Sequence, residues 1–355
     1  MLVEHMRDTS SPMRELHFPP DSSLGQFSSG IPHSPTYDID GDLLENDQQE
    51  VWLPAQGVIT VPVDNRNILI VDVAGAGDLS ALAHFQSDDL YAIDLSTAHV
   101  QNAQLKYLRN LTGLCVLNLS SLARDTTVND IGLDEMNLGE MIRLEHLSLS
   151  GTHITNDGMR YLQPLSSLRW LDLARVSVDD RGLSHISSLS HLQHVQLSYT
   201  KVSDVGLQYI EGLTELIELG LSFTRVHGEG LRYLSNLAHL SMLNLSGSTI
   251  QDAALTTLSS LTTLGSLDLS HTSLTNRGLM HIESLSTLRS LSLSNTSIDD
   301  KCAASLKELT NLRVLRLDRT SVGIDTINNL RADLPDCSIS FGSLGRLIPA
   351  HNAEL

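Results

Sequence analysis

The stretch that decides the fold is residues 144–162, LEHLSLSGTHITNDGMRYL, because related stretches follow it at a constant step of 24 residues. The next three are LRWLDLARVSVDDRGLSHI, LQHVQLSYTKVSDVGLQYI and LIELGLSFTRVHGEGLRYL. The paired apolar residues of the LxL core keep this step at Leu147/Leu149, Leu171/Leu173, Val195/Leu197, Leu219/Leu221, Leu243/Leu245, Leu267/Leu269, Leu291/Leu293 and Leu315/Leu317. Such self-similarity predicts a solenoid, in which each repeat forms one coil and buries its apolar side against its neighbours.

Within one coil the periodicity changes, which predicts a strand followed by a helix. The LxL part alternates with period two, so Leu147 points inward while His146 faces solvent. The second half has helical spacing, as in Leu207, Ile210 and Leu213. Each coil therefore supplies one strand to a parallel sheet and one short helix to the opposite side.

Polar residues and glycines recur where each helix begins. The N-cap candidates, whose side chains can accept a hydrogen bond from a free backbone N–H of the first turn, are Asn156, Asp180, Asp204, Asp252, Asn276 and Asp300. Two residues further on, room for the turn from loop into helix is left by Gly158, Gly182, Gly206, Gly230 and Gly278. We interpret both sets as structural, so pairs of carboxylates at these positions carry no acid–base role.

The coils at both ends of the array are irregular. We expect a solenoid over residues 61–345, closed by cap strands near residues 68–72 and 337–341, because a stack needs its apolar ends covered. An insertion within residues 120–143 lengthens one coil by six residues and is expected to bulge from one end of the strand face. The alternation over residues 58–63 is consistent with an edge strand added to the first cap.

The two tails differ in kind from the repeats. Residues 1–60 hold six of the ten prolines, many serines and the acidic run YDIDGDLLENDQQE. Because this composition buries too little apolar surface to offset the entropy of ordering, we expect the segment to be disordered. Residues 346–355 are expected to form a short C-terminal tail.

The repeat LxxLxLxxTxIxDxGLxxLxxL resembles the leucine-rich repeat over roughly residues 66–341. The resemblance implies an α/β fold, a right-handed horseshoe with parallel strands on the concave face and helices on the convex face. The TxITDxGL phrasing is similar to the cysteine-containing subclass found in substrate-binding halves of F-box proteins, with Thr in place of Cys, and to bacterial relatives. We interpret the threonine row as a structural ladder whose hydroxyls bond to the backbone of an adjacent coil: Thr152, Thr200, Thr224, Thr272, Thr296 and Thr320.

Composition and charge argue against several classes of partner. Asp and Glu outnumber Lys and Arg by 42 to 23, a formal charge of −19, which disfavours nucleic acid. No apolar run is long enough to span a bilayer, and residues 1–13 lack the apolar core of a secretory signal. We therefore expect a cytoplasmic location. The cysteines, Cys115, Cys302 and Cys337, are few and far apart, so we expect neither a disulfide framework nor a zinc site.

Motifs for catalysis or cofactor binding are missing from the sequence. We find no GxSxG elbow, no GxxxxGK[ST] phosphate loop and no GxGxxG between a strand and a helix. His146 and His194 share one outward strand position but are expected to lie two coils apart, too far to share a metal ion. We therefore predict a protein that is not an enzyme, with no catalytic residues, metal, cofactor or small-molecule substrate.

The strand face remains as the candidate surface for a partner. Aromatic residues are only 4% of the chain, yet Trp170, Tyr199 and Phe223 fall in three successive coils. Aromatic residues and Arg dominate interface hot spots. The predicted partner-binding set on the concave face is Trp170, Arg175, Tyr199, Phe223, His146, His194, Glu218 and Met242.

These observations favour a non-catalytic scaffold that binds a protein partner on its concave face, without a membrane or nucleic acid. The alternative is the substrate-recognition subunit of a ubiquitin-ligase adaptor, or a bacterial effector imitating one. That alternative requires a helical F-box-like segment before the repeats, and residues 1–60 show no convincing amphipathic helical run. Binding through the insertion or the acidic tail stays open.

Overall fold

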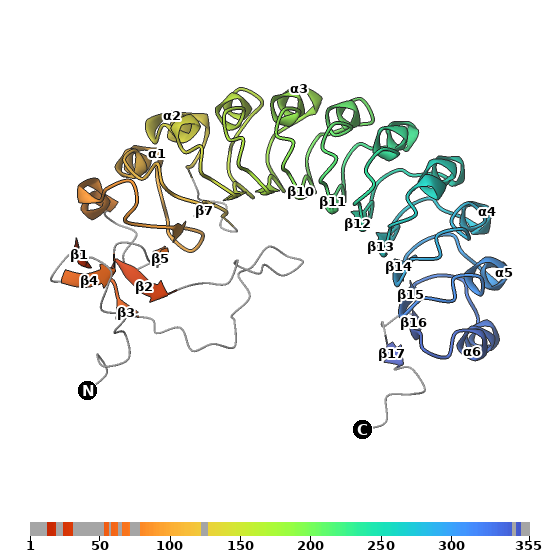
Figure 1. Ribbon diagram of the computed structural model, residues 1–355. Helices are drawn as coiled ribbons and strands as arrows, with labels where there is room; N and C mark the ends of the chain where they lie inside the picture. The colour runs from red at the N-terminus through yellow and green to blue at the C-terminus, as the bar shows by residue number, and fades with distance from the viewer. Residues whose placement is uncertain are drawn as a thin grey trace, which may run out of the picture. The chain divides into compact units, whose positions relative to one another are not determined.

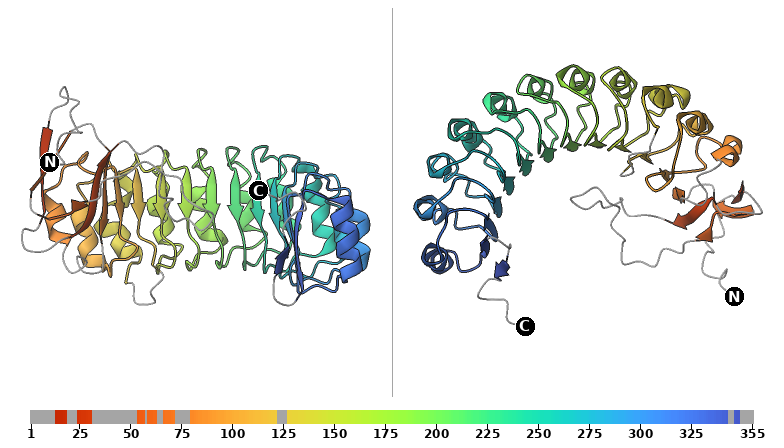
Figure 2. Two further views of the ribbon diagram at one scale, coloured as in Figure 1. Left: turned by 90° about the horizontal axis from the view of Figure 1, so that it is seen from below. Right: turned by 180° about the vertical axis from the view of Figure 1, so that it is seen from behind.

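The structure is a computed structural model, and it describes residues 13–18, 24–30, 53–56, 58–62, 66–71, 79–121, 127–342 and 346–348 (Figure 1). The chain divides into two compact units, Met1–Leu168 and Arg169–Leu355. In each unit, successive coils place strands along one face and short helices along the other, as Figure 2 shows from two further sides. This arrangement confirms the predicted α/β solenoid of repeated coils.

The first unit combines antiparallel cap strands with the first parallel coils. Its strands are β1 (Met13–His17), β2 (Gly25–Gly30), β3 (Leu53–Pro54), β4 (Val58–Pro62), β5 (Arg66–Val71), β6 (Ala92–Asp94), β7 (Val116–Asn118) and β8 (His146–Ser148). Its helices are η1 (Leu79–His84), α1 (Asn102–Leu105), η2 (Lys106–Leu108), α2 (Asp130–Glu135), η3 (Leu138–Glu140) and η4 (Gly158–Leu162). The sheet order is β3-β2-β5-β6-β7-β8, parallel from β5 to β8.

The second unit consists of coils of the same kind, whose strands form a parallel sheet in chain order from β9 to β16. Its strands are β9 (Trp170–Asp172), β10 (His194–Gln196), β11 (Glu218–Gly220), β12 (Met242–Asn244), β13 (Ser266–Asp268), β14 (Ser290–Ser292), β15 (Val314–Asp318), β16 (Ser338–Gly342) and β17 (Arg346–Ile348). Its helices are α3 (Asp180–Leu183), η5 (Ser184–Ile186), η6 (Gly206–Tyr209), η7 (Glu229–Leu234), η8 (Asp252–Ser260), α4 (Asn276–Leu279), η9 (Asp300–Cys302), α5 (Ala303–Leu306) and α6 (Ile324–Asp333). Strand β17 runs antiparallel to β16 and ends the sheet.

Exact register between coils builds the core. Leu219 pairs with Val195 on one side and with Leu243 on the other, so residues 24 apart in the sequence stack directly on one another. These inward side chains are fully or almost fully buried. Many of the helical segments are 3-10 turns, because a coil of this length leaves room for only one or two turns before the next strand.

The expectation of disorder over residues 1–60 was wrong for the part of that segment that the structure describes. Strand β2 pairs antiparallel with β5, and β1 pairs with β4 in a separate two-stranded sheet rather than β4 extending the cap sheet. Phe18 and Phe27 are buried, and the Phe18 ring lies 5.6 Å from Phe27 and 5.4 Å from Phe85. A composition averaged over sixty residues concealed these short strands, which contain few apolar residues; the acidic run at 37–50 lies outside the described residues.

The threonine row bonds within its own coil, which corrects the predicted bonds between coils. Each hydroxyl donates to the carbonyl oxygen three residues earlier, for example Thr200 Oγ1 to Leu197 O at 2.6 Å and Thr272 Oγ1 to Leu269 O at 2.6 Å. The same bond is made by Thr152, Thr224, Thr296 and Thr320. The turn after the strand brings this carbonyl within reach of the hydroxyl, so the row fixes the turn and leaves coil-to-coil contacts to other groups.

Those coil-to-coil contacts come from the Asp residues predicted as N-caps. Asp252 accepts hydrogen bonds from the Thr275 backbone N–H at 2.8 Å and the Thr275 hydroxyl at 2.5 Å, one coil later. Asp180 bonds in the same way to Ser203, and Asp300 to the Gly323 N–H. A hydrogen bond from Thr326 and the bond from Gly323 lower the pKa of the Asp300 carboxyl.

In the coils of Asp180 and Asp300, the capping side chain belongs to the preceding residue. Asp179 and Asp299 accept from the backbone N–H two residues on, at Arg181 and Lys301. The sequence therefore identified the right polar cluster and assigned the capping bond to the wrong member of it.

The glycines lie against this Asp ladder. A Cβ on Gly206 would lie 2.4 Å from Asp180 Oδ1, and one on Gly158 would lie 2.2 Å from Asp130 Oδ1. These distances explain why glycine recurs at this position, as the packing interpretation of the sequence expected.

We expect Gly230→Ala to lower the free energy of unfolding by about 2 kcal/mol, because its Cβ would lie 2.6 Å from the Asp204 carbonyl oxygen and 2.7 Å from its Cα, which are rigid backbone. The matched control is Gly212→Ala, whose Cβ would meet only Ser187 O at 3.9 Å and which should change stability by less than about 1 kcal/mol. Urea denaturation followed by circular dichroism measures both. Equal midpoints for the two variants would contradict the packing argument.

Candidate partner-binding site

A column of residues with left-handed backbone lies just beyond the C-terminal ends of strands β9 to β15. We call it the rim column; it consists of Arg175, Tyr199, Phe223, Gly247, His271, Asn295 and Arg319, all with φ between 53° and 67°. Each of these residues donates its backbone N–H to a carbonyl of the next coil, as Tyr199 does to Ser222 O at 2.8 Å and Phe223 to Ser246 O at 2.7 Å. The bonding between coils thus fixes the left-handed conformation whatever the side chain.

Because this conformation favours particular residue types, the side chains found in the column show where backbone preference did not decide the residue. Glycine and asparagine adopt it readily, whereas other residues pay on the order of 1 kcal/mol or more in backbone strain. The chain uses Gly247 and Asn295 in two coils, but Tyr199 and Phe223 in two others. Backbone requirements therefore do not explain the aromatic residues at this position.

The aromatic residues of the column form a continuous stack. The Tyr199 and Phe223 rings are parallel, with centroids 4.7 Å apart and an interplanar angle of 10°. The Arg175 guanidinium lies 5.2 Å from the Tyr199 centroid, and the His271 ring lies 6.2 Å from the Phe223 centroid. Tyr199 and Phe223 nevertheless stay 50% and 44% exposed. A half-exposed stack whose members hold each other in place is a rigid, partly apolar surface.

Gly247 completes the stack by its lack of a side chain. A Cβ there would lie 2.5 Å from the Cδ1 and Cε1 atoms of Phe223. The Phe223 ring therefore covers the Gly247 backbone and reaches toward His271 across the intervening coil. Gly247 is not among the predicted site residues, although a glycine at the same repeat position as Tyr199 is a signal for a positive φ.

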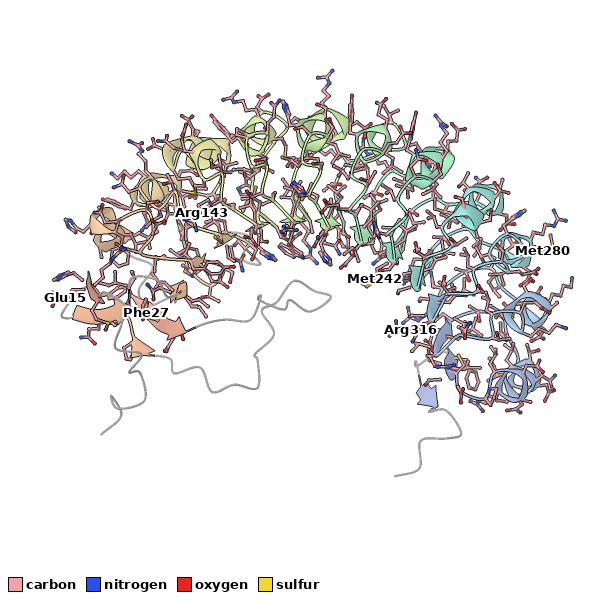
Figure 3. The ribbon with its side chains drawn as sticks, viewed as in Figure 1. Glu15, Phe27, Arg143, Met242, Met280 and Arg316 are labelled. Carbon is pink, nitrogen blue, oxygen red and sulfur yellow. The ribbon has the colours of Figure 1, made fainter. Side chains whose placement is uncertain are left out.

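A second group of predicted site residues forms a polar network on the strand face. His194 Nδ1 lies 3.1 Å from Glu218 Oε2, and Gln196 Nε2 donates to Glu218 Oε1 at 3.2 Å. The Glu218 side chain is only 16% exposed. Met242, in register with Glu218 one coil later, is half-buried on the strand face (Figure 3).

Trp170 does not belong to the exposed patch, which corrects the sequence expectation. It is 9% exposed, so it offers little area to a partner. Its position pairs directly with His194, and side chains in register on adjacent parallel strands stand about 4.8 Å apart, close enough to cover a flat ring. His146 is half-buried and belongs to the first unit, so it is described apart from this site.

The three cysteines are buried and carry no sign of a nucleophile. Burial raises the pKa of the Cys302 thiol to about 12, with nearby Asp300 and Asp299 adding to the rise, and burial raises the pKa of Cys337 to about 11. Among the described residues, no group of three His, Cys, Asp or Glu side chains could hold a metal ion. Within the same residues no helix is both long and apolar enough to cross a bilayer.

Two segments of the chain match the family described as Leucine Rich repeat, residues 143–162 and 188–210. No curated protein matches the sequence. The match to the repeat agrees with the motif and with the coils of both units. The narrower likeness to F-box proteins stays a prediction.

Solved structures with the same fold are distant in sequence. An internalin, inlF, from Listeria monocytogenes strain 4b F2365 is 20% identical with a TM-score of 0.57, over 79% of this chain and 80% of that chain. RP105 of mouse, in its complex with MD-1, is 20% identical with a TM-score of 0.55. That match covers 77% of this chain and 50% of the other, so this chain spans about half of that protein. These likenesses identify the fold as a leucine-rich-repeat solenoid.

We expect Cys302 and Cys337 to react with iodoacetamide at least about a hundredfold more slowly in the native protein than in the unfolded protein at about pH 8. The thiolate is the reactive form, and raised pKa values leave both groups protonated at that pH. Mass spectrometry of the labelled peptides assigns the rate to each cysteine. Rapid native labelling of either one would contradict the inert interpretation.

Proposed function

We propose that this chain is a non-catalytic protein-recognition module whose partner protein docks on the strand side of the second unit, at the rim column around Tyr199 and Phe223. The observation that supports it most is the half-exposed aromatic stack in a left-handed conformation that glycine or asparagine would adopt with less strain. A residue that costs backbone energy and gains little burial is best explained by a contact made with another molecule.

The geometry suits recognition because the surface is already ordered. Each ring is held by its neighbours and by the backbone bonds between coils, so binding freezes few side-chain rotations. Aromatic and arginine side chains carry a large share of binding energy in protein interfaces. The nearby His194–Glu218 pair and Met242 would complete a mixed polar and apolar contact area on the same strands.

The fold is compatible with this role. RP105 is found in a complex with MD-1, another protein, on a fold of the same kind. The likeness concerns the fold alone, so the proposal depends on the stack in this chain.

The ubiquitin-ligase adaptor considered from the sequence has no specific observation in its favour. The described residues before Leu79 form the cap strands β1 to β5 rather than a helical segment. We therefore retain the recognition module as the proposal, and we propose a cytoplasmic location for it.

We expect the double variant Tyr199→Asn, Phe223→Asn to lose binding while its free energy of unfolding stays within about 1 kcal/mol of the parent. Asparagine adopts the left-handed conformation, as Asn295 already does in the same column, so relief of strain offsets the lost stacking. Capture from a lysate of the source cell, followed by titration of the purified captured protein, measures the binding.

The matched control is Met280→Ala, which removes a 59% exposed apolar side chain on the helix side of the same unit, away from the strand face (Figure 3). A protein retained by the parent and by Met280→Ala, but lost from the Asn double variant, supports the proposal. If the titrated affinity is the same for all three proteins, the rim column is not the docking site.

A further inference from the structure

We propose that the occupant of the rim column is an extended acidic peptide segment, with carboxylates on either side of apolar residues, lying along the column from coil to coil. The inference rests on the proposed function and specifies its partner.

Cations border the aromatic stack without carboxylate partners. Lys201 lies two positions after Tyr199, and Arg225 lies two positions after Phe223. In both cases the threonine between the aromatic residue and the cation is buried. Both cations are exposed, as is Arg175 at the end of the stack. Within the described part of the chain, none of these three side chains forms an ion pair.

These cations lie in the less acidic half of a chain whose net charge is strongly negative. Residues 169–355 hold 19 acidic and 15 basic residues, a net charge of −4, so residues 1–168 carry the other −15. No member of the rim column is acidic. The second unit is therefore the half of the chain that could receive a short acidic segment, and the column is the uncharged or basic part of it.

Carboxylates near the column already have partners in the protein. Asp172 Oδ1 accepts the Ala174 N–H at 2.8 Å, and Asp204 accepts three backbone N–H groups of the next coil at 2.7 to 3.0 Å. Glu218 is paired with His194. These acids are held by hydrogen bonds or an ion pair within the protein, and none of them pairs with Arg175, Lys201 or Arg225, whose charges are left to attract a ligand.

The orientation of the rings selects among ligand classes. The facing planes of Tyr199 and Phe223 cover each other, Arg175 covers the far side of Tyr199, and Phe223 lies over Gly247 toward His271. What remains exposed is chiefly ring edge, which carries partial positive charge and attracts oxygen acceptors. Bases of a single-stranded nucleic acid need free ring faces for stacking, so the stack disfavours them.

The length of the column fits a short segment. Arg175 and Arg319 are separated by six steps of 24 residues. At about 4.8 Å for each coil the column is about 29 Å long, which corresponds to about nine residues of extended chain at about 3.3 Å each. A linear segment of this length could reach the cations at both ends with apolar side chains between them.

The test uses a display library of random peptides of about nine residues, selected on the full-length chain at about 50 mM salt. We expect the selected peptides to share at least two carboxylates around an apolar centre. Their affinity should fall at least about tenfold for the triple variant Arg175→Gln, Lys201→Gln, Arg225→Gln and on raising the salt to about 200 mM.

A charge-matched control keeps the test specific. The variant Arg277→Gln, Lys301→Gln, Lys307→Gln removes three exposed cations from helical segments of the same unit, and should bind the selected peptides as the parent does. A neutral or basic consensus, the absence of a consensus, equal effects of the two triple variants, or displacement of the peptides by single-stranded oligothymidine would overturn the inference.

The outcomes also separate this inference from the proposed function. If a ligand is lost with the Tyr199→Asn, Phe223→Asn variant but is unaffected by the Arg175, Lys201 and Arg225 substitutions, the column is the docking site and its partner is not acidic. If neither set of substitutions affects binding, both proposals fail.

Discussion

The hydrogen bonds between successive coils are the interaction on which the rest of this structure depends. Each coil lacks a core of its own, and its leucines are buried only when the next coil lies in register. Backbone bonds along the strands, the rim column and the Asp ladder enforce that register at three places on the coil. In the coils from Leu147 to Leu317 a constant length satisfies all three together, so the 24-residue step persists although the outward residues vary; the longer coil between Leu117 and Leu147 keeps the strand register.

The same constraint creates the candidate site. Because the turn after each strand donates its N–H to the following coil, the backbone at the rim column is left-handed in every coil of the second unit from Arg175 to Arg319. Stacked backbones then bring side chains 24 residues apart to the spacing of stacked rings, so Tyr199 and Phe223 meet at 4.7 Å without any further device. The scaffold sets the geometry of the stack, and only the choice of side chains is free.

Features that recur in every coil could be predicted from the sequence. Features that depend on the surroundings of one coil or one side chain could not. The strands, the inward leucines and the packing role of the glycines follow from periodicity, because one rule applies to every coil. Trp170 was misjudged because alternation gives the direction of a side chain but not the cover supplied by its neighbours. The threonine hydroxyls were given a plausible partner in the next coil, whereas the local turn offers a carbonyl of the same coil. The cap strands at residues 13–17 and 25–30 escaped notice because composition cannot locate short strands that are anchored by single buried side chains such as those of Phe18 and Phe27.

Backbone strain distinguishes the residues that stabilise the fold from those, such as Tyr199 and Phe223, that the fold does not explain. Residues that serve the fold occupy favourable backbone states and are buried, as the leucines are, or fill a space that only glycine fits, as Gly206 and Gly230 do. Tyr199 and Phe223 do neither, since they are strained and half exposed, and the same column shows with Gly247 and Asn295 that less strained choices are available. Stability alone would favour those choices in every coil. Tyr199 and Phe223 lie in neighbouring coils and form one stack with Arg175, and cations without carboxylate partners border that stack. A function of this surface therefore accounts for the two aromatic residues better than the fold does.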